Sequence, residues 1–327
     1  MAKITILGAG GWGMALAISA ASVGHTVNLW SPFKEEVVLL VNERTNEKLL
    51  KGVFLPEEIG VTDDISVADG SDITIFATPS TVIRSVASKL AERKDFGIVV
   101  NVSKGLEKGS LKRLSEVISE ELPQSDVVVL TGPSHAEEVA RFVPTTIVAA
   151  SKNASAAEKV QNIITTNFLR VYTSYDVIGA EIGGALKNVI AIASGFSIGL
   201  KLGDNTRAAL ITRGLAEMAR LGVSLGAREY TFAGLTGIGD LIVTCTSQHS
   251  RNNRFGQLVG SGMKVEEVLE KVGTVEGYYA TKMAYELSLK HNIEMPIISE
   301  CYNVLYGEKS VEKALQDLLT RPIKSEH

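Results

Sequence analysis

The chain has 327 residues with 33 basic and 37 acidic side chains, so its net charge of −4 gives no general attraction to nucleic acid or to an anionic membrane. This length exceeds the size at which one hydrophobic core usually stops growing, which predicts two domains. The two cysteines, Cys245 and Cys301, belong to no CxxC or Cys/His cluster. We therefore expect no disulfide framework and no metal site, and we expect both cysteines to be small buried residues.

The first half of the chain alternates between short β-branched segments and helix-like segments. The expected strands lie at 4–7, 26–30, 72–77, 97–102, 127–130, 145–150 and 170–173. The helix-like segments include 12–23, 80–91 and 111–122. Apolar strands that alternate with helices are typical of a parallel sheet covered on both faces. The sequence therefore predicts an α/β fold, with a doubly wound parallel sheet in residues 1–176.

After residue 176 the strand pattern ends, and the rest of the chain reads as helices. These are expected at 179–200, 205–222, 265–272, 278–291, 296–306 and 311–319. The change in periodicity predicts a second, all-helical domain in residues 177–327. No apolar run is long enough for a membrane span, and no charged-then-apolar leader precedes the first strand, so we expect a cytoplasmic protein.

Three glycines separate the first expected strand from the first expected helix. Gly8 permits a tight turn, Gly10 lets a pyrophosphate approach the backbone, and Gly13 allows the helix to lie close to the sheet. An ordinary flexible turn is the alternative. Because the motif lies between a strand and a helix and a second strand follows, the pattern favours a dinucleotide site.

The end of the second expected strand lacks the acid that usually binds the ribose of NAD. Trp30 and Ser31 stand at that place, so the sequence predicts that no carboxylate repels a ribose phosphate there. Ser31 and Lys34 could contact such a phosphate. NADP is therefore allowed beside NAD and could be the preferred cofactor, although Lys34 could equally be a solvated charge at a helix start.

Polar residues follow two further expected strands. Lys104, at the end of an apolar strand, is placed to meet an anionic group of a substrate or cofactor. Ser134 lies in a similar position after the next strand. Its spacing to Glu137 also fits a capping box, which would be a purely structural role.

In the helical half, Lys187 follows a run of small residues and precedes an apolar stretch. A lysine that borders a buried helix is costly unless it has a partner or a chemical role, and a proton-transferring lysine is one such role. The alternative is that its ammonium group reaches solvent.

Two other segments carry candidate chemistry. Asp240 lies next to glycines, and a polar loop at 247–254 contains Arg251 beside hydroxyl and amide donors, a combination that grips small phosphates. A basic loop that caps a helix is the alternative. Glu276 precedes a helix, where a first-turn acid is common.

Seven segments stand out together: GAGGWGMALA, VSKGL, GPSHAEEVA, GGALKNVIAIASG, NTRAALITRGLAEMARLG, GLTGIGDLIVTCTSQHSRNNRFG and EGYYATK. In their order and nearly in their spacing they resemble the NAD(P)-dependent sn-glycerol-3-phosphate dehydrogenase family. The resemblance covers almost the whole chain. It implies a Rossmann-type cofactor domain, a helical substrate domain, and oxidation of glycerol 3-phosphate to dihydroxyacetone phosphate, usually run in reverse for phospholipid synthesis. It also implies a cytoplasmic homo-oligomer, commonly a dimer.

The resemblance also implies roles for individual residues, with Lys187 as the proton acceptor. The residues implied around the substrate are Lys104, Gly132, Ser134, Asp240, Ser250, Arg251 and Asn252. Those at cofactor positions are Gly11, Trp12, Lys104, Ala136, Arg251 and Glu276. Two residues depart from the family pattern: Pro32 stands where relatives often have a basic or polar residue near the adenosine, and Thr274 stands where an apolar residue is common.

These roles assemble into a hypothesis for the reduction of the ketone. Hydride passes from the nicotinamide to the carbonyl carbon, and protonated Lys187 donates a proton to the oxygen while Asp240 orients the ammonium group. Lys104 adds positive potential, and Arg251 holds the phosphate. One alternative is a 3-hydroxy-acid dehydrogenase with the same two domains, and another is a non-catalytic NAD(P)-binding regulator.

Overall fold

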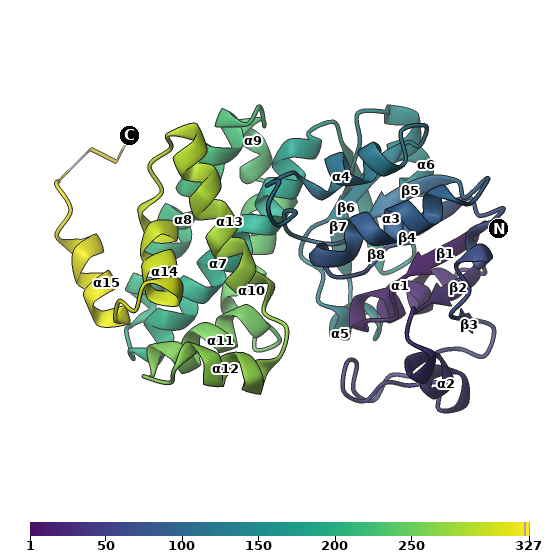
Figure 1. Cartoon of the computed structure of the whole chain (residues 1–327), viewed down its shortest axis with the longest axis horizontal. Coiled ribbons are helices and arrows are strands. Elements are labelled where there is room, and N and C mark those ends of the chain that lie inside the picture. The colour runs from purple at the N-terminus through teal and green to yellow at the C-terminus, as the bar shows by residue number, and fades with distance from the viewer. Residues whose placement is uncertain (324, 327) are drawn as a thin grey trace. The chain divides into compact units, whose positions relative to one another are not determined.

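A computed structural model describes residues 1–323 and 325–326, which form two compact units. The first unit comprises Met1–Glu181, and the second begins at Ile182. Figure 1 shows strands gathered in the N-terminal unit, whereas the described part of the C-terminal unit is built from helices. The α/β fold with a helical second half, predicted from the periodicity, is confirmed.

Eight strands form one sheet in the order β3-β2-β1-β4-β5-β6-β7-β8. Their bounds are β1 Lys3–Leu7, β2 Thr26–Trp30, β3 Gly60–Thr62, β4 Ile73–Phe76, β5 Ile98–Asn101, β6 Val127–Thr131, β7 Thr145–Ala150 and β8 Leu169–Ser174. All seven expected strands are present. The sequence analysis missed only β3, a three-residue strand at the sheet edge that carries no periodicity of its own.

The central strands end at the same level. Leu7 of β1 pairs with Trp30 of β2 on one side and with Phe76 of β4 on the other. The chain leaves β1 toward β2 and later returns to β4 on the opposite side of β1. Such a switch point opens a crevice beyond the carboxyl ends of the strands, where ligands of this fold bind.

One step of the sheet departs from the expected parallel arrangement, because β6 and β7 pair antiparallel. The connection at 132–144 contains only the four-residue helix α5, Ala136–Val139. A parallel neighbour would require a crossover back to the opposite end of the strands, usually made by a longer helix. Helix α6, Ala154–Ile164, provides such a crossover between β7 and β8, which are parallel.

Helices cover both faces of the sheet. The remaining helices of the first unit are α1 Gly11–Ala21, α2 Lys34–Asn42, α3 Ile83–Ala91 and α4 Leu114–Glu121, with 3₁₀ turns η1 Ile65–Ala68 and η2 Ser80–Val82. Ile6 belongs to the buried cluster that contains α1 and α6, whereas its neighbour Leu7 belongs to the cluster that contains α3 and α4. Because neighbouring residues of a strand point to opposite faces, these two cores show the doubly wound arrangement.

The second unit is organised around helix α7, Val177–Gly199, whose N-terminal turn belongs to the first unit. The other elements are α8 Asp204–Ser224, α9 Glu229–Phe232, the π-helical turn η3 Leu235–Gly239, α10 Asp240–Thr246, α11 Arg251–Gly260, α12 Val265–Val272, α13 Glu276–His291, α14 Pro296–Tyr306 and α15 Val311–Leu319. The expectation that no apolar run is long enough for a membrane span is wrong by length and composition, because α7, alone among the described helices, could cross a membrane. However, 94% of its apolar window is buried inside the protein. It has the burial of a core helix.

The small residues of α7 allow close packing, as expected. A Cβ atom on Gly183 would lie 2.4 Å from the carbonyl oxygen of Thr236, and one on Gly195 would lie 2.2 Å from that of Asn253.

The expectation of a polar loop over residues 247–254 is partly wrong, because α11 begins at Arg251 and the loop ends at Ser250. The side chain of Ser250 caps this helix by accepting the N–H of Asn253, which fixes where the loop stops.

Candidate functional site

The glycine turn after β1 has the backbone geometry that the sequence predicts. Gly8 has φ +125°, and a Cβ there would lie 2.6 Å from the carbonyl oxygen of Ala77. A Cβ on Gly13 would lie 2.0 Å from the carbonyl oxygen of Gly8, so α1 can approach the turn only without a side chain at this place. A Cβ on Gly10, by contrast, would meet nothing within 4 Å. The N-terminus of α1 therefore faces open space, which fits the phosphates of a dinucleotide.

The other predicted residues of the first unit gather near this turn. The Lys104 ammonium donates to the carbonyl oxygen of Gly132 over 3.1 Å, and the Ser134 hydroxyl donates to the same oxygen over 2.9 Å. Ala136 begins α5, and its Cβ would lie 3.9 Å from a Cβ on Gly11. The loops after β5 and β6 are thus joined through the carbonyl of Gly132, and α5 lies beside the first turn of α1.

The structural alternative for Ser134 is wrong. The N-cap of α5 is His135, and no side chain caps this helix. Ser134 instead uses its hydroxyl to hold the loop backbone at Gly132, which has φ +139°. Its position is therefore set by the loop after β6 and not by a capping box.

The expectation that no carboxylate stands at the end of β2 is also wrong. The hydroxyl of Ser31 donates a hydrogen bond to the carboxylate of Glu36, and it accepts the N–H of Phe33 over 3.3 Å. Glu36 lies five residues after Ser31, in the first turn of α2, and this turn brings its side chain back to the strand end. Lys34 is the exposed first residue of the same helix.

Lys187 is buried in the second unit and does not reach solvent, so the solvent-directed alternative is wrong. Its side chain forms an ion pair with Asp240 and donates to the hydroxyl of Thr244 over 2.8 Å. Lys187 is 6% exposed and Asp240 only 1%. The Thr244 hydroxyl in turn donates to the backbone carbonyl of Asp240 over 2.6 Å. Two residues one turn apart on α10 therefore hold one ammonium group from α7.

A second polar contact joins α7 to two other helices next to Lys187. The amide nitrogen of Asn252 donates to the side-chain oxygen of Asn188 over 2.9 Å. The side-chain oxygen of Asn252 accepts the N–H of Gly277 over 2.9 Å. Since Gly277 follows Glu276 at the start of α13, these two hydrogen bonds hold the starts of α11 and α13 against the middle of α7.

The first turn of α11 carries the predicted phosphate-binding residues. Ser250 is buried at its N-cap, whereas Arg251 is exposed and has no ion-pair partner among residues 1–323 and 325–326. A helix N-terminus with an arginine, a hydroxyl and an amide is suited to a small anion. The structure thus places Ser250, Arg251 and Asn252 on one turn.

Sequence reasoning missed three residues of these clusters: Thr244, Asn188 and Gly277. A signal existed for two of them. Thr244 follows Asp240 by four residues and so lies on the same helix face, and Asn188 is a polar neighbour of Lys187 in an apolar stretch. Gly277 contributes through its backbone. A Cβ at that position would lie 2.6 Å from the carbonyl oxygen of Asn188.

No group of three His, Cys, Asp or Glu side chains that could hold a metal ion is found in the described part of the chain. Both cysteines are buried, as predicted. Burial raises the pKa of the Cys245 thiol to about 12 and also raises the pKa of Cys301. Both thiols therefore stay protonated at neutral pH and behave as apolar residues.

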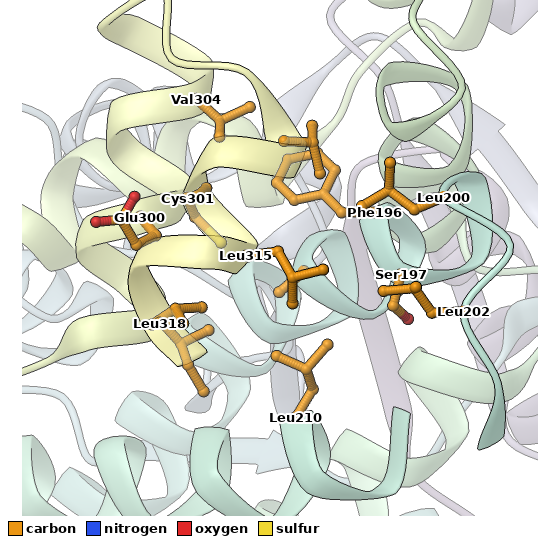
Figure 2. Close-up of a pocket in the computed structure, with 14 residues that line it drawn as sticks. Phe196, Ser197, Leu200, Leu202, Leu210, Glu300, Cys301, Val304, Leu315 and Leu318 are labelled. Carbon is orange, nitrogen blue, oxygen red and sulfur yellow. The ribbon is translucent and has the colours of Figure 1, made fainter. Parts of the chain in front are cut away.

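The described part of the second unit also has a small apolar cavity of about 40 Å³ (Figure 2). Phe196 and Leu200 of α7 line it together with Cys301 and Val304 of α14 and Leu315 of α15. Its volume is close to that of a single water molecule, and its walls carry few polar groups, so it is a packing gap. It contains none of the predicted site residues.

Known proteins are similar to this chain over nearly its whole length. Family models described as the N-terminus and the C-terminus of NAD-dependent glycerol-3-phosphate dehydrogenase match residues 3–157 and 176–316. A glycerol-3-phosphate dehydrogenase (NAD(P)+) of Desulfitobacterium hafniense is 49% identical over 100% of this chain and 93% of its own length. One of Geobacillus thermodenitrificans is 51% identical over 100% and 97%.

A solved structure extends the likeness to three dimensions. The crystal structure of glycerol-3-phosphate dehydrogenase from Coxiella burnetii has a TM-score of 0.94 and 39% sequence identity, and the match covers 98% of this chain and 99% of that one. The similarity therefore includes both the sheet-containing unit and the helical unit.

Proposed function

Because the chain belongs to the family of NAD-dependent glycerol-3-phosphate dehydrogenases, we propose that Lys187 is the residue that gives and takes the proton in its reaction. The chain is an NAD(P)-dependent oxidoreductase that acts on a CH–OH group, and its substrate is a phosphorylated triose derivative. The reaction is the reversible interconversion of dihydroxyacetone phosphate and sn-glycerol 3-phosphate.

The observation that carries the assignment of Lys187 is its burial against Asp240 and Thr244. A bound nicotinamide supplies or accepts the hydride in this chemistry. In the reductive direction, the ammonium of Lys187 donates its proton to the oxygen of the reduced carbonyl group. Asp240 orients the ammonium and stabilises its charge, and in the oxidative direction neutral Lys187 takes the proton back.

The cofactor would be held by the first domain, residues 1–176. Gly8, Gly10 and Gly13 make room for the pyrophosphate, and this assignment rests on the open space in front of Gly10. The family resemblance adds Gly11, Trp12, Lys104 and Ala136, together with Arg251 and Glu276 from the second domain, residues 177–327.

The triose phosphate would be held by Arg251 with Ser250 and Asn252. Arg251 is exposed in the first turn of α11, where its charge and the helix dipole both favour an anion. The carboxamide of Asn252 is fixed by Asn188 and Gly277, so it can present its remaining N–H without rotating. The family resemblance places Lys104, Gly132 and Ser134 at the substrate as well.

The wider setting follows from the family resemblance and is part of the proposal. We propose a cytoplasmic homodimer that supplies glycerol 3-phosphate for phospholipid synthesis. The burial of α7 is consistent with a protein that has no membrane span. Neither a 3-hydroxy-acid dehydrogenase nor a non-catalytic regulator is retained, because the chain belongs to a different enzyme family.

The test is the reduction of dihydroxyacetone phosphate, followed by loss of NADH or NADPH absorbance. Lys187→Ala should lower turnover by about 10²- to 10⁴-fold, which is the usual contribution of a proton-transfer residue. Dinucleotide binding should be unchanged. Lys201→Ala is the matched control, because Lys201 is an exposed lysine just after α7.

Removal of Lys187 alone leaves Asp240 as an unpaired buried charge, which destabilises a fold. The double variant Lys187→Met/Asp240→Asn removes both charges and should be folded by circular dichroism while remaining inactive. Turnover that survives in a folded Lys187 variant would show that this lysine is not the proton-transfer residue.

A further inference from the structure

The carboxylate at the end of β2 comes from a place that the sequence pattern does not indicate. An acid that binds the ribose of NAD usually ends the second strand itself, about 20 residues after the glycine motif. In this chain Ser31 stands there, and Glu36 reaches back to it from the first turn of α2. Because Ser31 is only 1% exposed, its hydroxyl is a fixed anchor for the carboxylate.

The position of this carboxylate matters for the adenosine end of a dinucleotide. β2 is the immediate neighbour of β1, and Trp30 at its end pairs with Leu7 just before the glycine turn. In this fold the adenosine ribose lies beyond the end of the second strand when the pyrophosphate lies at the glycine turn. Glu36 therefore stands where the 2′ substituent of that ribose is recognised.

The charges around Glu36 decide whether a 2′-hydroxyl or a 2′-phosphate on the ribose is favoured. A helix N-terminus attracts anions, and at α2 this favourable place is already taken by the protein's own carboxylate. Lys34 is the nearest cation in sequence, but it is exposed, as is Glu35. Exposed charges are screened by solvent, whereas a half-buried carboxylate fixed by a hydrogen bond is screened less.

We propose that Glu36, held by Ser31, makes this chain select NAD(H) over NADP(H). This inference rests on the proposed cofactor site at the glycine turn. The carboxylate accepts hydrogen bonds from the ribose hydroxyls of NAD(H), and it repels the 2′-phosphate of NADP(H). The absence of an acid on β2 itself therefore does not make the chain NADP-selective.

The test is direct binding, without triose substrate. Calorimetric titration of the full chain compares NADH with NADPH, and adenosine 5′-monophosphate with adenosine 2′,5′-bisphosphate, which differ only in the 2′-phosphate. NADH should bind roughly tenfold or more tightly than NADPH, and Glu36→Gln should reduce this ratio by about tenfold through loss of the like charge. Ser31→Ala frees the carboxylate and should reduce the ratio less.

Glu35→Gln is the matched control, because it removes the same charge from an exposed neighbour and should leave the ratio within about twofold. Tighter binding of NADPH by the unmodified chain would overturn the inference, as would equal effects of Glu35→Gln and Glu36→Gln. If neither dinucleotide binds, the cofactor site itself is wrong, and the inference fails with it. If both bind and NADPH is preferred, only the inference fails.

Discussion

Two buried charged groups of the helical unit, Lys187 and Glu217, differ in what surrounds them. Lys187 meets a carboxylate and a hydroxyl from α10. Glu217, on α8, accepts the backbone N–H groups of Ile297 and Ile298 over 2.8 and 3.2 Å. It thereby caps α14, whose own N-cap residue, Met295, provides no side-chain cap. Both side chains are buried ionisable groups, so the nature of the partner separates the proposed proton-transfer group from a structural one.

The titration of Glu217 reflects this structural role. Burial raises its pKa to about 7, although the two backbone N–H groups act in the opposite direction. The carboxyl group is therefore a helix cap whose charge the fold tolerates poorly. Lys187, by contrast, forms an ion pair with Asp240.

The largest expected difference in stability and turnover is between variants that lack Asp240, the partner of Lys187, and variants that lack Glu217. Asp240→Ala should destabilise the protein by about 3–5 kcal/mol, because it leaves Lys187 buried without its partner. The folded fraction should also lose most of its turnover. Glu217→Ala should lower stability as well but leave turnover per folded molecule unchanged. Urea unfolding combined with the dihydroxyacetone phosphate assay separates these effects, and equal loss of turnover in both variants would contradict the distinction.

A second prediction concerns the substrate phosphate. Arg251→Ala should raise the KM for dihydroxyacetone phosphate by about 10- to 100-fold, the range expected for loss of a charged hydrogen bond. Stability should hardly change, because Arg251 is exposed. Arg254→Ala is the control, since Arg254 is an exposed arginine one turn further along α11. An unchanged KM in the Arg251 variant would remove its phosphate-binding role.

The third prediction uses pH to isolate Glu217. In the folded protein its carboxyl keeps a proton up to about pH 7, whereas in the unfolded chain it loses the proton near its ordinary pKa of 4.5. The folded state thus binds more protons in this window, and stability falls as pH rises from about 4.5 to 7. Above pH 7 the full loss of folding free energy is present, which is about 1.4 kcal/mol for each unit by which the folded pKa exceeds the unfolded one.

Glu217→Gln should abolish this contribution. Its stability relative to the unmodified protein should therefore rise between pH 5 and pH 8, as measured by the midpoint of urea unfolding. Glu229→Gln serves as the control, because Glu229 is exposed. A constant difference between the Glu217 variant and the unmodified protein across this range would contradict the raised pKa.

The smallest expected effect concerns the apolar cavity. Val304→Ile adds one methylene at its wall and should stabilise the protein by about 0.5 kcal/mol if the group fits the gap. Turnover and both Michaelis constants should stay the same, because none of the predicted site residues lines this cavity. A change in turnover, measured by the same absorbance assay, would link the cavity to the reaction.

The elements of secondary structure could largely be predicted from the sequence. Helices α12, α14 and α15 begin and end where their periodicity predicts, and the seven longer strands were all found. These features depend on residues that are close in sequence, so a local pattern contains the necessary information. Elements with little pattern of their own, such as β3 and the four-residue helix α5, were missed.

The glycine turn and the candidate residues could also be identified from the sequence, because their spacing is local and the resemblance covers nearly the whole chain. The antiparallel step between β6 and β7 was decided by tertiary structure, as was the burial of Lys187 against α10. In each case the deciding contact joins separate elements, and its geometry depends on how those elements pack rather than on the order of residues along either one.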